Sequence, residues 1–246
     1  EDNLRLAILY MNNGRWNGEQ IVSEEELGKH NFDEIILNRF KPYIGKNYQV
    51  IAKEKNANIS NNPKNKFAII ANAIIATGKC SNINRSEEFI KAGLTMKTIR
   101  IQHNGSIKES MSFENIDYME VAECDNWYES RLYELFSSRF IFVVFKEQTP
   151  NKGDYVLDNV FFWTMPREDL EWAETYWVHI RKNILDNHIS EEYWWKSKDK
   201  KKFHVRPKAQ KATKLALSPN GKWVKKFCYW FNNDYVKQIV NNNGSK

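Results

Sequence analysis

Patterns typical of metal sites and of nucleophilic active sites are absent from this sequence. Its three cysteines, Cys80, Cys124 and Cys228, are more than forty positions apart and form no C-x-x-C pair. Neither a zinc ribbon nor a disulfide framework is therefore indicated, and we expect a reducing, cytoplasmic environment. The five histidines lack H-E-x-x-H spacing, and no G-x-x-x-x-G-K-[ST] loop or G-x-S-x-G elbow occurs. These absences exclude metalloproteases, P-loop NTPases and elbow-type hydrolases.

Glycine, proline and long apolar runs are also scarce. The chain has 10 Gly and 6 Pro among 246 residues, with 14% aromatic and 41% hydrophobic residues, which argues against disorder. The apolar run at 140–145 is far shorter than the roughly 20 residues that cross a bilayer, so we expect no membrane partner. No secretory signal is seen, and because the sequence begins with Glu1 rather than Met we expect a longer parent chain.

Charge is distributed unevenly along the chain, whose net charge is +6. Residues 196–246 hold fourteen Lys or Arg and two acids, a net charge of +12. Residues 1–195 hold 23 basic and 29 acidic side chains, a net charge of −6. Such polarity is typical of a protein that presents one face to a polyanion. A solvated lysine-rich tail is the alternative.

Hydrophobic periodicity predicts an α/β or α+β body after a leader or linker at residues 1–30. Apolar residues at helical spacing predict helices at 32–40, 67–76 and 167–186. Runs of β-branched and aromatic residues predict strands at 93–101, 139–146 and 155–163.

The basic C-terminal part is predicted to be a two-stranded ribbon. Residues 203–206 and 223–230 have strand character and are separated by a polar loop that runs to Gly221. Asn233 or Asp234 can cap a closing helix at 235–240. The cations of this part are Lys200, Lys201, Lys202, His204, Arg206, Lys208, Lys211, Lys214, Lys222, Lys225 and Lys226. A ribbon can enter the major groove of DNA, where Arg or Lys reaches guanine and other cations neutralise phosphates.

Several motifs of this part resemble one known family. Arg206-Pro-Lys-Ala209, Thr213-Lys214 and Gly221-Lys-Trp-Val-Lys-Lys226 are similar to the DNA-reading segment of MutH and of related GATC-cutting restriction endonucleases. Lys108-Glu-Ser-Met-Ser-Phe113, Phe203-His-Val-Arg-Pro207 and Trp230-Phe-Asn-Asn-Asp-Tyr235 resemble the C-terminal half of the two-domain, Sau-type GATC enzymes. The resemblance covers roughly residues 32–240 and implies the MutH-type fold, a mixed sheet flanked by helices, with residues 31–246 as one DNA-binding domain.

The resemblance also implies which residues contact DNA. Arg206, Lys208 and Ala209 would lie against base edges, and Pro207 would stiffen the loop that carries them. Lys214 and Lys225 or Lys226 would lie on the DNA backbone, and Lys211 is a further expected DNA contact. Trp223 stands where the family has an aromatic residue, although an ordinary core aromatic is the alternative for it. A solvated pair is the alternative for Arg206 and Lys208.

The nuclease motif of the family is degraded in this sequence. The family's Asp, followed by a Glu-x-Lys triplet, falls on Glu88, Thr95 and Lys97, and the preceding helix contains no carboxylate. A neutral threonine cannot replace a ligand of Mg²⁺, so we expect no catalytic residues and no metal in this domain. Recruitment of Glu87, Glu109 or Glu114 into the site is the alternative. Lys97 would be a phosphate contact or a lysine without a role.

The sequence therefore predicts a non-catalytic, allosteric effector domain that binds GATC in double-stranded DNA. Its partners would be DNA and a catalytic domain of the same parent chain, which would use Mg²⁺, and a dimer could form on DNA. Two alternatives remain open: an active Mg²⁺-dependent MutH-like endonuclease that uses Glu88, Lys97 and a recruited acid, and a nucleic-acid-binding module without sequence preference.

Overall fold

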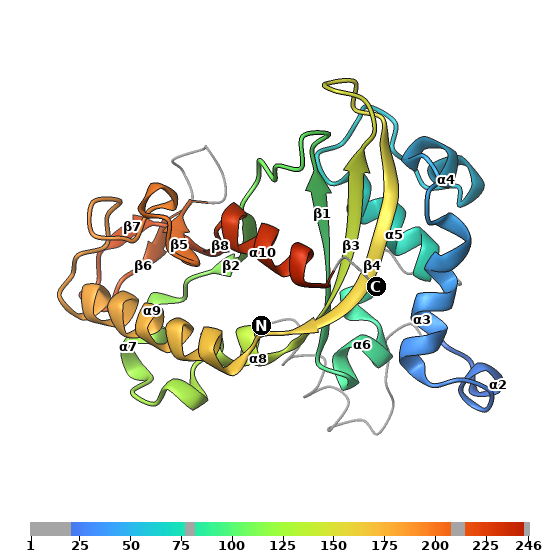
Figure 1. Ribbon diagram of the computed structural model, residues 1–246. Helices are drawn as coiled ribbons and strands as arrows, with labels where there is room; N and C mark the ends of the chain where they lie inside the picture. The colour runs from blue at the N-terminus through green and yellow to red at the C-terminus, as the bar shows by residue number, and fades with distance from the viewer. Residues whose placement is uncertain (1–20, 77–81, 208–214, 244–246) are drawn as a thin grey trace. The chain divides into compact units, whose positions relative to one another are not determined.

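The computed structural model describes residues 21–76, 82–207 and 215–243 (Figure 1). These residues form two compact units. Unit 1 comprises Glu1–Ser106 and Arg139–Trp163, and unit 2 comprises Ile107–Ser138 and Thr164–Lys246.

Unit 1 is built on a three-stranded mixed sheet with the order β1-β3-β4. Its strands are β1 (Leu94–Ile101), β3 (Arg139–Glu147) and β4 (Tyr155–Thr164). Strands β1 and β3 are parallel, whereas β3 and β4 follow each other as a hairpin (Figure 1). The helical segments of this unit are α2 (Glu24–Leu27), α3 (Phe32–Phe40), η1 (Lys41–Tyr43), α4 (Tyr48–Glu54), α5 (Lys66–Ile75), η2 (Ile83–Arg85) and α6 (Glu87–Lys91).

One face of this sheet forms the core of unit 1 with the helices. Side chains two positions apart on a strand share a face, which places Leu94 and Met96 of β1 beside Ile141 and Val143 of β3. All four are buried in one cluster with the apolar residues of α3, α4 and α5. Helix α5 is buried on most sides, as expected from its continuous apolar sequence.

Unit 2 contains a second three-stranded sheet, β2-β8-β5, and a separate hairpin of β6 and β7. Its strands are β2 (Met111–Asn115), β5 (Phe203–Arg206), β6 (Leu215–Leu217), β7 (Trp223–Lys225) and β8 (Cys228–Phe231). Strand β8 is antiparallel to both of its neighbours. The helical segments are α7 (Tyr118–Glu123), η3 (Trp127–Glu129), α8 (Arg131–Ser137), α9 (Arg167–Leu185), η4 (Ser197–Asp199) and α10 (Asn233–Asn243).

Aromatic rings hold unit 2 together. Phe203 of β5 packs on Phe136 of α8, on Tyr176 of α9 and on Tyr235 of α10, with ring centroids 5.2 to 5.5 Å apart. Phe231 of β8 contacts the same core from the neighbouring strand. Each such ring buries a large apolar area, so this face of the sheet anchors three helices.

The predicted mixed sheet flanked by helices is confirmed. The predicted helices at 32–40, 67–76 and 167–186 correspond to α3, α5 and α9, and the predicted strands of the body correspond to β1, β3 and β4. The helices and strands that were not predicted are α2, α4, α6, β2, α7, α8 and β6. The helix predicted at 235–240 begins earlier, at Asn233, with Asn232 before it, so neither proposed cap residue stands ahead of the helix.

The predicted strand at 223–230 is wrong as a single element. It divides into β7 and β8, which belong to different sheets, and β7 pairs with β6 from the region that was predicted to be a polar loop. Tyr118 causes the break, because its hydroxyl donates to the carbonyl oxygen of Lys225 at 2.7 Å and accepts from the Phe227 amide at 3.1 Å. The buried Phe227 side chain therefore redirects the chain between the two sheets.

The described part of the predicted leader packs with unit 1. Ile21 and Val22 are buried in its core, and Ser23 caps the short helix α2. Within the described residues, no helix has the length and hydropathy that crossing a bilayer would require. The predicted boundary at residue 30 stays a prediction.

Candidate nucleic-acid interface

Arg206 stands at the end of β5 with its side chain exposed to solvent. Its guanidinium carbon lies 4.1 Å from the centre of the Trp230 ring, and its carbonyl oxygen accepts the Trp230 indole N–H at 2.9 Å. Trp230 is buried on the adjacent strand β8, so it forms a fixed support beneath the cation. No carboxylate of the described residues pairs with Arg206. The guanidinium can therefore still donate hydrogen bonds to a ligand.

His204 lies directly opposite Trp230 in the register of β5 and β8. The two rings are stacked, with centroids 6.0 Å apart, and the imidazole is fully buried with no hydrogen-bond partner on either nitrogen among the described residues. Burial, and then the positive charge of Arg206, lower the pKa of His204 to about 4. His204 is therefore neutral at physiological pH and is not one of the cations that the sequence suggested.

The β6–β7 hairpin carries the second group of predicted contacts. Its turn has Gly221 at a positive φ of 79°, a conformation that suits glycine, and the buried Ser218 hydroxyl donates to the carbonyl oxygen of Lys222 at 2.8 Å. Trp223 is 67% exposed, so the alternative of a core aromatic is wrong. Lys222 is exposed beside it.

Lys225 and Lys226 differ in their surroundings. Lys225 forms an ion pair with Glu191 at 2.6 Å, whereas Lys226 is half-buried and forms no ion pair within the described part of the chain. Pro207 follows Arg206 and is half-buried. The remaining predicted contacts, Lys208, Ala209, Lys211 and Lys214, lie outside the described residues.

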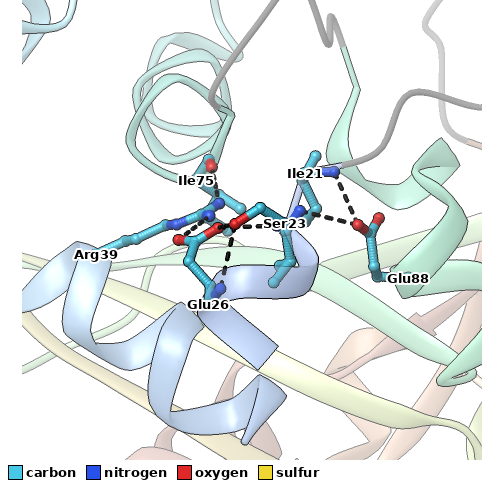
Figure 2. A network of polar contacts seen from close by, with 7 residues as sticks. Ile21, Ser23, Glu26, Arg39, Ile75 and Glu88 are labelled. Atoms are coloured by element: carbon cyan, nitrogen blue, oxygen red, sulfur yellow. Dashed lines mark hydrogen bonds and ion pairs between the residues drawn. The ribbon is translucent and has the colours of Figure 1, made fainter. Parts of the chain in front are cut away.

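In unit 1, Glu88 has a specific structural role (Figure 2). Its Oε1 atom accepts hydrogen bonds from the backbone amides of Ile21 and Val22, both at 2.9 Å. Its Oε2 atom is buried and has no partner among the described residues. The carboxylate therefore holds the chain that enters unit 1, with Oε1 engaged by two amides and Oε2 buried.

A second anchor lies beside this one (Figure 2). Arg39 donates to the carbonyl oxygen of Ile75 at 2.6 Å and to Glu26 at 2.8 Å. The Ser23 amide and then the Arg39 guanidinium lower the pKa of Glu26 to about 2, because both stabilise its charged form. Residues 21–26 are thus attached to the body of unit 1 at two points.

The other positions of the nuclease motif lie on β1, where Thr95 and Lys97 are half-buried. Two of the acids that were considered for recruitment form ion pairs: Glu87 pairs with Lys91, and Glu114 of unit 2 pairs with Arg131 at 2.6 Å. Glu109 is also in unit 2. Across the described ranges, no group of three His, Cys, Asp or Glu side chains could hold a metal ion. These residues do not fit Mg²⁺, although the absence of cleavage stays a prediction.

Comparison with known proteins gives two matches. Residues 78–174 match the family model of MutH, described as DNA mismatch repair enzyme MutH. The type II restriction enzyme Sau3AI from Staphylococcus aureus is 27% identical to the chain over 261 residues. Both matches support a MutH-like restriction-endonuclease family for the chain. The Sau3AI match covers 87% of this chain but 52% of Sau3AI, so the chain spans about half the length of that relative.

The comparisons and the sequence motifs point to the same family, but the motifs missed residues that shape the candidate interface. Trp230, which supports Arg206, and Tyr118, which separates β7 from β8, come from apolar runs that indicated only core. Leu215 and Leu217, exposed on β6, lie in a segment that was predicted to be polar loop. Alternation of apolar residues at 215 and 217 was the available signal for a short strand.

Proposed function

We propose that this chain binds double-stranded DNA at GATC sequences as a non-catalytic effector part of a type II restriction endonuclease. The observation that carries this proposal is the state of Arg206. Its guanidinium is exposed, rests on a buried tryptophan and has no carboxylate partner within the described residues. A guanidinium held in this way is suited to donate two parallel hydrogen bonds to O6 and N7 of guanine in the major groove.

The effector role is supported by the chemistry of the degraded nuclease motif. Glu88 is committed to two backbone amides, and Thr95 carries no charge. Cleavage would then depend on a catalytic domain elsewhere in a longer parent chain, which would bind Mg²⁺ and to which this part would signal that DNA is bound. The half-length match to Sau3AI supports a longer parent. A dimer on DNA belongs to the same proposal, because GATC is its own complement and presents the same edge twice.

A binding experiment with matched duplexes tests the proposal. Fluorescence anisotropy at one fixed salt concentration should give at least about tenfold tighter binding to a GATC duplex than to a scrambled duplex. Arg206→Ala should remove about 1–3 kcal/mol of this discrimination, because the bidentate contact to guanine is lost. Arg167→Ala is the matched control, since Arg167 is 93% exposed on α9 of the same unit. Equal affinity of the unmodified chain for both duplexes would refute the proposal.

Cleavage by this chain itself is the second candidate function. It is favoured by the extent of the MutH match, which includes Glu88, Thr95 and Lys97. Incubation of a GATC plasmid with Mg²⁺ separates the two candidates. Nicking or linearisation that is lost in Glu88→Ala would establish the nuclease, and selective binding without cutting would establish the effector.

A further inference from the structure

The β6–β7 hairpin of unit 2 exposes large apolar side chains on one face. Leu215 and Leu217 are 43% and 42% exposed, and Trp223 is 67% exposed. In the antiparallel register Leu217 faces Trp223 and Leu215 faces Lys225, so all four side chains share that face. Ala216 and Val224, on the opposite face, are half-buried. We call Leu215, Leu217 and Trp223 the apolar face of the hairpin.

Exposure of this kind has a cost that a soluble hairpin normally avoids. A two-stranded ribbon that exposes leucines to solvent invites association with other molecules. The inward positions have the smaller residues Ala216 and Val224, whereas the larger apolar residues point outward, which is the reverse of the pattern that stabilises a hairpin on its own unit. The apolar face is therefore suited to contact a partner.

Cations around the apolar face indicate the chemistry of that partner. Lys222 is in the turn, Lys225 shares the face, and Lys226 follows β7 directly. Lys225 is paired with Glu191, but an apolar protein surface would have to desolvate the ammonium groups of Lys222 and Lys226 without compensation, whereas a polyanion would neutralise them. A two-stranded ribbon also has the width that the major groove admits.

Base edges in the major groove offer one apolar feature, which is the 5-methyl group of thymine. GATC contains one thymine in each strand. On the basis of the proposed DNA binding, we propose that Leu217, together with Trp223 opposite it, contacts the thymine methyl group and so contributes to the choice of sequence. The proposal gives Leu217 of β6 a role in sequence specificity. Leu217 was not among the DNA contacts predicted from the sequence motifs.

Replacement of thymine by deoxyuridine tests the contact, because it removes the methyl group and leaves base pairing intact. The unmodified chain should bind the GAUC duplex about fourfold more weakly than GATC, from about 0.8 kcal/mol per buried carbon and 1.4 kcal/mol per tenfold change. In Leu217→Ala, the difference between the two duplexes should become much smaller than fourfold, because only Trp223 remains to contact the methyl group. Deoxyuridine placed outside GATC should have no effect.

Two controls keep the outcomes distinct. Leu185→Ala removes a leucine of similar exposure, 48%, from α9 and should keep the fourfold difference. Leu217→Met retains apolar area and should keep most of the fourfold difference between GATC and GAUC binding. If the unmodified chain prefers GATC but binds GATC and GAUC equally, the thymine contact is refuted while the proposed function stands. A loss of affinity in Leu217→Ala that leaves the ratio of GATC to GAUC binding at the value of the unmodified chain would also refute it, in favour of an apolar wedge. An absence of any GATC preference would instead refute the proposed function.

Discussion

The two units use their charged side chains in different ways. In unit 1, charges join elements that are distant in sequence: Arg139 of β3 pairs with Asp33 of α3 at 2.8 Å, Arg39 binds the end of α5, and Glu88 holds the entering chain. In unit 2, Arg206 and Lys222 have no ion-pair partner within the described residues and lie at a strand end and in a turn. A charge satisfied inside the fold stabilises structure, and an unsatisfied one at the surface remains available for a ligand.

Unit 2 also contains cations that are not available. Lys202 pairs with Asp169, which in turn accepts the Tyr235 hydroxyl at 2.6 Å. The net charge of +12 over residues 196–246 therefore overstates the charge presented to DNA. This difference in the use of charge can be tested in each unit. In unit 1 an internal anchor is removed, and in unit 2 groups near Arg206 are changed.

The largest effect is expected on removal of the Glu88 anchor. Glu88→Ala leaves the amides of Ile21 and Val22 without their charged acceptor, and hydrogen bonds to charged groups contribute about 1.5–3 kcal/mol each. Hydrogen exchange at these two amides should accelerate by about ten- to a hundredfold, and GATC binding by unit 2 should not change. Glu87→Ala is the control, since Glu87 pairs with Lys91. Unchanged protection in Glu88→Ala would contradict the anchor.

A smaller effect is expected for His204, through the dependence of stability on pH. Because burial lowers the pKa of His204 to about 4, from an unfolded value of about 6.5, the unfolded state takes up a proton that the folded state does not. Its contribution to stability is therefore complete above about pH 6.5 and is lost as the pH falls toward 4. Because of His204 alone, the free energy of unfolding should drop by about 2 kcal/mol between pH 7 and pH 5.

Denaturant unfolding of His204→Leu at both pH values measures this contribution. The variant lacks the titrating group, so its loss of stability over the same range should be smaller by about 2 kcal/mol. His188→Leu, at an exposed position of the same unit, should behave like the unmodified chain. An identical pH dependence in His204→Leu would show that the ring is not held neutral.

The smallest effect is expected at the ion pair of Lys225 and Glu191. Both side chains are largely exposed, 40% and 64%, so Glu191→Ala should change the stability by less than about 1 kcal/mol. Its removal frees Lys225 and lowers the negative charge near the hairpin, which should raise DNA affinity about two- to threefold at low salt. Glu192→Ala removes the same charge from the next position without freeing a lysine. Equal effects of both variants would mean that Lys225 does not contact DNA.

Local sequence patterns predicted the body of the fold because its elements are long and strongly periodic. Strands β1, β3 and β4 and helices α3, α5 and α9 each have an uninterrupted apolar pattern. Short elements escaped prediction. Strand β6 has three residues and β7 has three, and the division at Phe227 depends on the Tyr118 hydroxyl, more than a hundred residues earlier in the chain. A local pattern cannot contain a hydrogen bond of such sequence separation.

The sequence by itself determined the resemblance to the MutH family and the concentration of positive charge near the C-terminus, because these are properties of residue type and spacing. Only the tertiary structure decided which charges are used internally. It placed Arg206 on Trp230, made His204 a neutral buried ring, turned the apolar face of the hairpin outward and committed Glu88 to the entering chain. Burial and pairing depend on neighbours that folding brings together, and these neighbours set the charge and the availability of each side chain.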